Sequence, residues 1–258
     1  MKIILNHESI DYTVDLGKPI DISIPSGQVK CFYATDYQAS PYVSGDFIGS
    51  VKAGAPVNFY DVQINPHGNG THTECLGHIT EEQESLPEQM KQFHFIAQLV
   101  SVSLYKHEHG DESITLEALK SACPDTLPEA VILRTIPNTS EKLNKDYSGS
   151  NPPYLDHEAM SFLVQQGVRH LLIDLPSVDR EMDDGILHCH HIFWNVDNKR
   201  AIDESRMDCT ITELIYVADE VEDGLYFLNI QVPNLPLDAA PSKPVLYNMT
   251  CINNNKKR

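Results

Sequence analysis

Apolar positions along the chain mostly alternate with polar ones or run together in short stretches, and both patterns are typical of strands. The alternating segment over 57–65 predicts a strand that ends at Pro66. The apolar run over 130–135 has the composition of a strand that is covered on both faces. By these patterns we expect strands over 12–14, 20–24, 29–33, 57–65, 95–105, 130–135, 170–175, 211–218 and 225–232.

Two segments have the features of helices. Residues 113–120 begin with Ser or Thr as the N-cap and carry an acidic residue in the first turn. The clearest helix extends from Asp156 to Gly167, with an apolar face at every third or fourth position. A strand follows it directly at 170–175, and the order strand, helix, strand predicts a parallel crossover. The fold class is therefore α/β.

Composition and charge exclude several classes of protein. The chain has 258 residues, of which 41% are hydrophobic and 22% charged, as in ordinary globular proteins. No composition shift marks a boundary, so we expect one domain over 1–258, with residues 253–258 as a solvated, disordered tail. The formal net charge of −18 excludes nucleic acid as a partner, because phosphate binding needs clustered Lys and Arg. The same charge argues against an anionic membrane surface.

The chain also lacks the patterns of exported and membrane proteins. The first residues have one Lys and only three consecutive apolar positions, which does not match a secretory signal. No run of 18 apolar residues is present, so we expect no membrane span. The six cysteines include no CxxC pair. We therefore expect reduced thiols and a cytoplasmic location.

Three His and one Glu fall within residues 65–78, directly after a predicted strand. Imidazole and carboxylate are the ligands that Zn²⁺ and similar ions prefer. His72 and Glu74 point the same way in an extended chain, and glycines at 68 and 70 allow backbone angles that would fold His67 toward them. His78 lies near enough to act without ligating. The competing interpretation is a surface turn with solvated side chains.

A second candidate group lies in the acidic and His-rich segment 183–194. It follows a predicted strand and a turn, where loops often carry function. On its own the run of His188, His190 and His191 is a weak signal, equally compatible with a solvated loop. Glu213, in a β-favouring run, fits the exposed face of an amphipathic strand as well as a functional site.

Taken together, these segments resemble the metal-dependent hydrolases of the cyclase or kynurenine formamidase (arylformamidase) family. The family signature is H-x-G-T-H-x-D-x-P-x-H, and residues 70–74 followed by His78 keep the GTH, an acid and the last His at the same spacing. Residues 173–179 are similar to the family's "giDtpSvD" segment, and Thr212-Glu213-Leu214 to its late E-N-L. The resemblance spans about residues 57–235.

Departures from the signature mark a divergent subgroup. The family's first His would stand at Gly68, whereas His67 lies one residue earlier. Glu74 replaces the usual Asp, and Leu76 replaces Pro.

The resemblance implies a swivelling β/β/α domain with a mixed sheet and flanking helices, assembled as a homodimer or higher homo-oligomer. It implies one or two Zn²⁺ ions, or Mn²⁺ in their place. It further implies that His78 is the catalytic residue and that the metal ligands are His67, His72, Glu74, His190 and Glu213.

The leading hypothesis is metal-dependent hydrolysis of a small-molecule amide, N-formyl compound or cyclic amide, as in an arylformamidase. Metal-activated water would attack the carbonyl carbon, and His78 would transfer protons. Two alternatives are a lactone- or ester-opening hydrolase with the same site, and an inactive relative that binds a small ligand. His191 is the alternative to His190 as the inner ligand.

Overall fold

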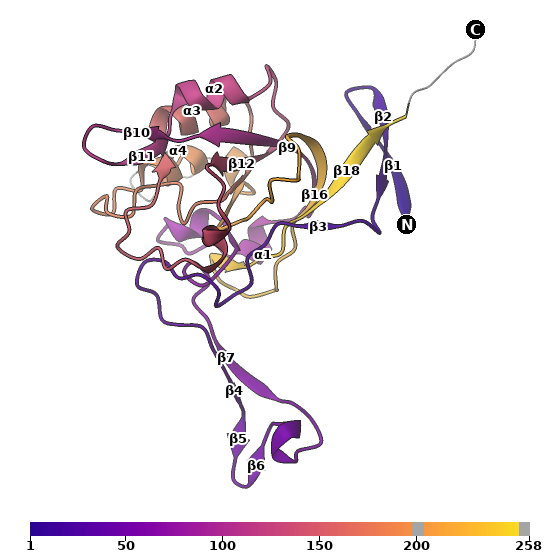
Figure 1. Ribbon diagram of the computed structural model, residues 1–258, viewed down its shortest axis with the longest axis vertical. Helices are drawn as coiled ribbons and strands as arrows, with labels where there is room; N and C mark the ends of the chain where they lie inside the picture. The colour runs from indigo at the N-terminus through magenta and orange to yellow at the C-terminus, as the bar shows by residue number, and fades with distance from the viewer. Residues whose placement is uncertain (198–203, 253–258) are drawn as a thin grey trace.

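Most strands belong to one large mixed sheet (Figure 1). The computed structural model describes residues 1–197 and 204–252, so the tail expected at 253–258 lies outside the described residues. The strands follow one another across the sheet in the order β1 (Lys2–His7), β2 (Ile10–Asp15), β18 (Val245–Cys251), β16 (Gly224–Asn229), β9 (His94–Ser103), β12 (Ala130–Ile136), β14 (His170–Ile173), β15 (Thr210–Glu213), β8 (His72–Glu74) and β17 (Ala239–Pro241), with β3 (Ile20–Asp21) beside β18.

The centre of this sheet is parallel. β12 pairs in parallel with β9 on one side and β14 on the other, and β14 pairs in parallel with β15. Six of the seven residues of β12 are buried, which confirms a strand covered on both faces. Between β12 and β14 the chain forms α3 (His157–Gln165), so the predicted parallel crossover is also confirmed. Gly167, at φ +83°, follows this helix in the left-handed conformation.

The helices α2 (Leu116–Ala122), α3 and α4 (His188–Trp194) gather on one side of the sheet, as Figure 1 shows. Thr115 is the N-cap of α2, where its hydroxyl accepts a hydrogen bond from the Ala118 backbone. The remaining helical segments are short, namely α1 (Leu86–Gln89) and the 3₁₀ turns η1 (Val51–Ala53), η2 (Leu76–His78), η3 (Ser140–Asn144) and η4 (Glu204–Arg206).

The His-rich run over 188–194, whose pattern left a solvated loop open, forms the helix α4. The carboxylate of Asp179 accepts backbone N–H hydrogen bonds from Cys189, at 2.8 Å, and His190, at 3.1 Å. These bonds satisfy donors that a first helical turn leaves free. The buried side chains of Cys189, His190, Phe193 and Trp194 then hold one face of the helix against the core.

Other expected strands differ in length or are absent. The run over 29–33 forms only a bridge between Lys30 and Asp146, and Phe32 and Tyr33 have φ near +55°. The run over 95–105 divides into β9 and the short β10 (Tyr105–Lys106), which joins β11 (Glu112–Ile114) and β13 (Tyr154–Leu155) in a separate sheet. The strands β1 and β18 have no counterpart in the sequence prediction.

The expected strand over 57–65 is shorter and lies outside the main body. It forms β7 (Tyr60–Gln63), which pairs with β4 (Gln38–Pro41) in a ribbon whose tip contains β5 (Val43–Ser44), β6 (Phe47–Ile48) and η1. We call residues 38–63 the arm. Figure 1 shows the arm projecting from the body of the molecule.

The buried apolar side chains form one large cluster around the central strands and one small cluster. The small cluster consists of Ile24, Val29, Cys31, Tyr147 and Leu214. All six cysteines are free. In the parts of the chain that the structure describes, no helix has the length and apolar character to cross a membrane.

Burial of His170 makes stability depend on pH. Its ring packs against Phe95 and is 5% exposed, and burial lowers its pKa to about 4. In the unfolded chain the ring takes up a proton near pH 6.5. The contribution of His170 to the free energy of unfolding is therefore fully present above pH 6.5 and is lost as the pH falls toward 4.

We therefore expect the free energy of unfolding to fall between pH 6.5 and 4, with His170 accounting for up to about 3 kcal/mol. Denaturant titrations of wild type, His170→Gln and the exposed-site control His94→Gln would measure this. The pH dependence should flatten in His170→Gln only, and an unchanged slope would contradict the assignment.

Candidate metal centre

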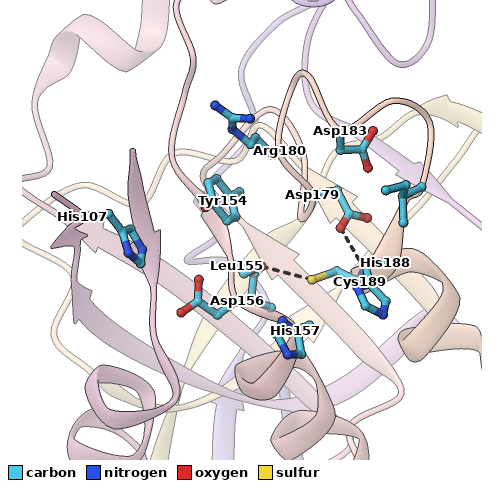
Figure 2. A pocket seen from close by; sticks show the side chains of 11 residues that line it. His107, Tyr154, Leu155, Asp156, His157, Asp179, Arg180, Asp183, His188 and Cys189 are labelled. Atoms are coloured by element: carbon cyan, nitrogen blue, oxygen red, sulfur yellow. Dashed lines mark hydrogen bonds between the residues drawn. The ribbon is translucent and has the colours of Figure 1, made fainter. Parts of the chain in front are cut away.

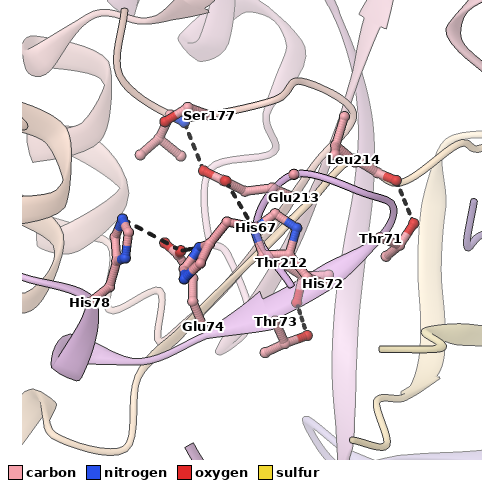
Figure 3. A network of polar contacts seen from close by, with 12 residues as sticks. His67, Thr71, His72, Thr73, Glu74, His78, Ser177, Thr212, Glu213 and Leu214 are labelled. Atoms are coloured by element: carbon pink, nitrogen blue, oxygen red, sulfur yellow. Dashed lines mark hydrogen bonds and ion pairs between the residues drawn. The ribbon is translucent and has the colours of Figure 1, made fainter. Parts of the chain in front are cut away.

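Antiparallel pairing of β8 with β15 sets the base of the candidate site. The register places His72 directly opposite Glu213, so both side chains lie on the same face of the sheet. On the opposite face, the hydroxyls of Thr73 and Thr212 share a hydrogen bond of 2.8 Å. Thr71 accepts from the Ile24 backbone and donates to the Leu214 carbonyl, which fixes the start of β8 (Figure 3).

His67 reaches this face despite its one-residue offset. Its Nδ1 lies 3.1 Å from Glu74 Oε2. Neither Gly68 nor Gly70 adopts a left-handed conformation, so the backbone freedom expected of them is not used. Gly68 is needed because a Cβ there would lie 2.3 Å from that of Ala34. Close packing of the turn, and not unusual backbone angles, therefore brings His67 into the cluster.

His190 joins the cluster from α4. Its Nδ1 donates to Asp179 Oδ2 at 2.6 Å, while its Nε2 lies 3.1 Å from Glu74 Oε1. Both ring nitrogens thus face carboxylate oxygens. This arrangement is satisfied only if the ring carries a second proton or shares a cation with Glu74.

Asp238 links two of the histidines and was not predicted. Its Oδ2 accepts from His67 Nε2 at 2.9 Å and from His78 Nδ1 at 3.2 Å. The residue precedes β17, which pairs with β8 on the side away from β15. A lone acid outside any motif carries no sequence signal, and only this strand pairing places it beside His67.

The donor atoms converge as a metal site requires. The groups His67, Glu74, His78 and His72, Glu74, Glu213 each offer ligand atoms that all lie within 4.8 Å of one another. Glu74 belongs to both groups. The residues present therefore fit one or two divalent ions held by nitrogen and oxygen donors.

The strongest sign of a cation is the environment of His72. Its Nδ1 donates to the Gly70 carbonyl, at 3.1 Å, which leaves a lone pair on Nε2. That nitrogen is fully buried and has no hydrogen-bond partner, and it faces Glu213 Oε2 at 3.4 Å. Glu74 Oε2 is likewise buried without a hydrogen bond. A lone pair held against a carboxylate is costly unless a cation lies between them.

The distribution of charge in the cluster also favours a bound cation. Burial opposes charge on His67, but the hydrogen bond from its ring to Asp238 and the nearby carboxylate of Glu74 raise its pKa to about 10. Burial also opposes charge on Glu74, yet His78, His190 and His67 hold the pKa of this carboxyl well below its usual range. The cluster is electrostatically suited to positive charge.

A cavity of about 330 Å³ opens onto the cluster, and its walls include His67, His78, His190 and Glu213. A second cavity of about 390 Å³ lies beside it and shares Arg180 with the first. Figure 2 shows this second cavity, where Asp179 of the preceding loop accepts a hydrogen bond from the Cys189 backbone of α4.

The structure brings all six candidate residues together, namely His67, His72, Glu74, His78, His190 and Glu213. Their individual roles as ligands or catalyst stay predictions. His188 lies in the second cavity with its ring stacked on that of His157, and His191 bonds to the Val196 carbonyl. Of the three histidines on α4, His190 is the one that contacts the cluster.

Comparisons with known proteins agree with this geometry. The Cyclase family model matches residues 14–180. A comparison with curated proteins found no match.

Among solved structures, the chain aligns over 90% of its length with 98% of a potential metal-dependent hydrolase with cyclase activity, at 16% identity and a TM-score of 0.60. It aligns over 89% of its length with 98% of a predicted metal-dependent hydrolase from Bacillus stearothermophilus, at 16% identity and a TM-score of 0.58. Isatin hydrolase A from Labrenzia aggregata, bound to benzyl benzoate, aligns over 93% of its length with 89% of this chain, at 11% identity and a TM-score of 0.61. These likenesses confirm the expected mixed sheet with flanking helices.

We expect the purified protein to bind about one or two equivalents of zinc through this cluster. The variant Glu213→Gln should bind zinc at least tenfold more weakly, because it removes one of the donors around His72. Zinc at 100 times its Kd should raise the Tm of wild type by about 5–10 °C. Elemental analysis and thermal melts would measure both. His188→Ala is the matched control and should bind like wild type. Equal zinc content in Glu213→Gln would place the ion elsewhere.

Proposed function

The chain belongs to the cyclase family, and we propose that its cluster is the active site of a metal-dependent hydrolase of small amides, N-formyl compounds or cyclic amides. The observation that carries the proposal is the buried lone pair of His72, which faces Glu213 within a set of nitrogen and carboxylate donors. Such a set is suited to zinc or manganese. Glu74 belongs to both ligand groups, which supports two ions as well as one.

The proposed ligands are His67, His72, Glu74, His190 and Glu213. When bound, a divalent ion there would supply polarisation of a carbonyl group and acidification of water. The side chains of this chain would hold the ligands in place and transfer the protons. Asp179 holds His190 through the 2.6 Å hydrogen bond, and the Val178 backbone donates to Glu213 Oε1 at 3.0 Å. These contacts hold the ligands in place before substrate arrives.

His78 is the proposed acid and base. Its side chain is 29% exposed and lines the 330 Å³ cavity, so it can reach a substrate. Its Nδ1–H donates to Asp238, which leaves the lone pair on Nε2. Nε2 can therefore take a proton from attacking water and deliver it to the departing nitrogen.

The cavity supports a small substrate with an amide bond. Its volume suits a molecule of about drug size or smaller. Three of the similar structures are isatin hydrolases, and isatin is a cyclic amide. Arg180, held by an ion pair and a hydrogen bond to Asp111, also lines the cavity and places a positive charge on its wall. The six free thiols support a cytoplasmic enzyme.

The zinc-loaded protein should hydrolyse members of a panel of N-formylated aromatic amines and cyclic amides faster than lactones and esters of matched size. His78→Ala should lower kcat by about 10²–10⁴-fold, because a positioned proton-transfer group is lost. Steady-state kinetics would be measured beside zinc content, with His188→Ala as the control. Full turnover in zinc-loaded His78→Ala would refute the role of His78, and turnover of esters alone would favour the lactone-opening alternative.

Asp238→Asn should lower kcat by about 10–100-fold, because the imidazole of His78 loses the carboxylate that sets its tautomer and orientation. Zinc content and kinetics would be compared in Asp238→Asn and Asp238→Glu. The Glu variant, which keeps the charge, should retain more activity. Equal activity in the two variants would show that the charge of Asp238 is not needed.

A further inference from the structure

The wall of the 330 Å³ cavity carries two carboxylates that the proposed mechanism does not use. Glu181 and Asp183 line this cavity beside Arg180, on the loop between β14 and α4. The positive charge of Arg180 is balanced by Asp111, whose Oδ2 lies 2.8 Å from the Arg180 Nε. In the part of the chain that the structure describes, neither Glu181 nor Asp183 forms an ion pair. Their two negative charges are therefore not balanced by a partner side chain.

Backbone N–H groups hold both carboxylates in place. Glu181 accepts hydrogen bonds from Gly149, at 2.6 Å, and from Asn151, at 3.2 Å. Asp183 accepts from two backbone N–H groups of its own loop, at 2.7 and 2.9 Å. These donors are neutral, so they fix the orientation of the carboxylates without cancelling their charge. Each carboxylate oxygen keeps a further lone pair for a ligand.

An aromatic ring lies on the same cavity. Phe32 is 39% exposed and has a left-handed backbone conformation, with φ +55°. Bulky residues seldom adopt this conformation, and it persists only where the surrounding structure fixes it. The next residue, Tyr33, donates its backbone N–H to the Ser148 hydroxyl at 3.0 Å. Because Glu181 is bonded to the same segment, 148–151, this segment fixes both the ring and the carboxylate.

Metal ions in the cluster would not make this wall positive. The cluster and its contacts include four carboxylates, those of Glu74, Asp179, Glu213 and Asp238. Their negative charges equal the positive charge of two divalent ions and exceed that of one, while imidazole ligands bind as neutral groups. Burial raises the pKa of the Cys31 thiol, next to Phe32, and Glu181 is among the carboxylates that raise it further. The wall beyond the cluster is therefore negative.

We propose that this wall selects amides that carry a positively charged amine, with Glu181 and Asp183 as the specificity-determining residues. Carboxylates form charge-assisted hydrogen bonds with ammonium groups, and the face of an aromatic ring such as Phe32 attracts cations. The net charge of −18 also steers cations toward the protein. The inference rests on the proposed function, because it narrows the substrate class of that same site.

Three N-formylanilines of nearly the same shape would test the preference. Their para substituents are aminomethyl, which is cationic, ethyl, which is neutral, and carboxymethyl, which is anionic. With zinc-loaded wild type, kcat/KM for the cationic compound should exceed that for the neutral one by at least about fivefold, the effect of one ion pair near a surface. The anionic compound should be the poorest substrate. Raising the salt concentration from about 20 to 500 mM should reduce the preference, because salt screens exposed charges.

The paired variant Glu181→Gln, Asp183→Asn keeps an oxygen acceptor at each position and removes both charges. It should lower the ratio of kcat/KM between the cationic and neutral compounds to about 1, whereas a disturbed cavity would lower both values together. The matched control Asp125→Asn, Glu158→Gln removes the same charge at exposed positions that line neither cavity, and should keep the wild-type ratio. A wild type without the preference, or an unchanged ratio in the paired variant, would overturn the inference.

A binding measurement separates this inference from the proposed function. Benzyltrimethylammonium has a permanent positive charge and no lone pair, so it cannot act as a metal ligand. Isothermal titration calorimetry should show binding to wild type and at least about threefold weaker binding to the paired variant. Absence of turnover for all three formanilides would count against the proposed hydrolase, and the titration would still decide the cation preference. Equal binding of benzyltrimethylammonium to wild type and the paired variant would overturn it.

Discussion

The site depends on one antiparallel pairing, that of β8 with β15, because it holds the buried lone pair of His72 against the carboxylate of Glu213. The nitrogen is fully buried and has no hydrogen-bond partner, so folding alone leaves it in an unfavourable contact with the carboxylate. Threonines on the reverse face fix the pairing through their hydroxyls. The fold thus holds an unfavourable contact that a bound cation would remove. Binding of a cation would therefore stabilise the folded state.

The remaining site residues are attached to this pair from three directions. The turn before β8 supplies His67, the helix α4 supplies His190, and the strand β17 on the other edge of β8 brings Asp238. Carboxylate contacts restrict the orientation of both rings, since Asp238 bonds to His67 and Asp179 bonds to His190. Glu213 ends β15, which is parallel to β14, so the site lies at the carboxyl ends of parallel strands, where α/β folds usually place chemistry.

The acidic character of the chain acts differently at three places. Around the cluster, carboxylates raise the pKa of His67 and favour a bound cation. Over the rest of the surface the charge of −18 keeps copies of the chain apart. In the arm, acids are nearly missing and apolar side chains take their place.

The sequence by itself determined the central strands and the crossover helix, because these depend on local period and capping residues, and its ligand chemistry supplied the candidate donors. It predicted His72, Glu74 and Glu213 for one site, and the structure places their ligand atoms within 4.8 Å of one another. The glycines at 68 and 70 serve close packing and not the backbone angles expected of them, and the helix α4 was not predicted. Asp238, which lies 171 residues from His67, could only be found in the folded chain. The edge strands, the exposed arm and the convergence of donor atoms are decided by strand register and packing between distant segments, which no local pattern records.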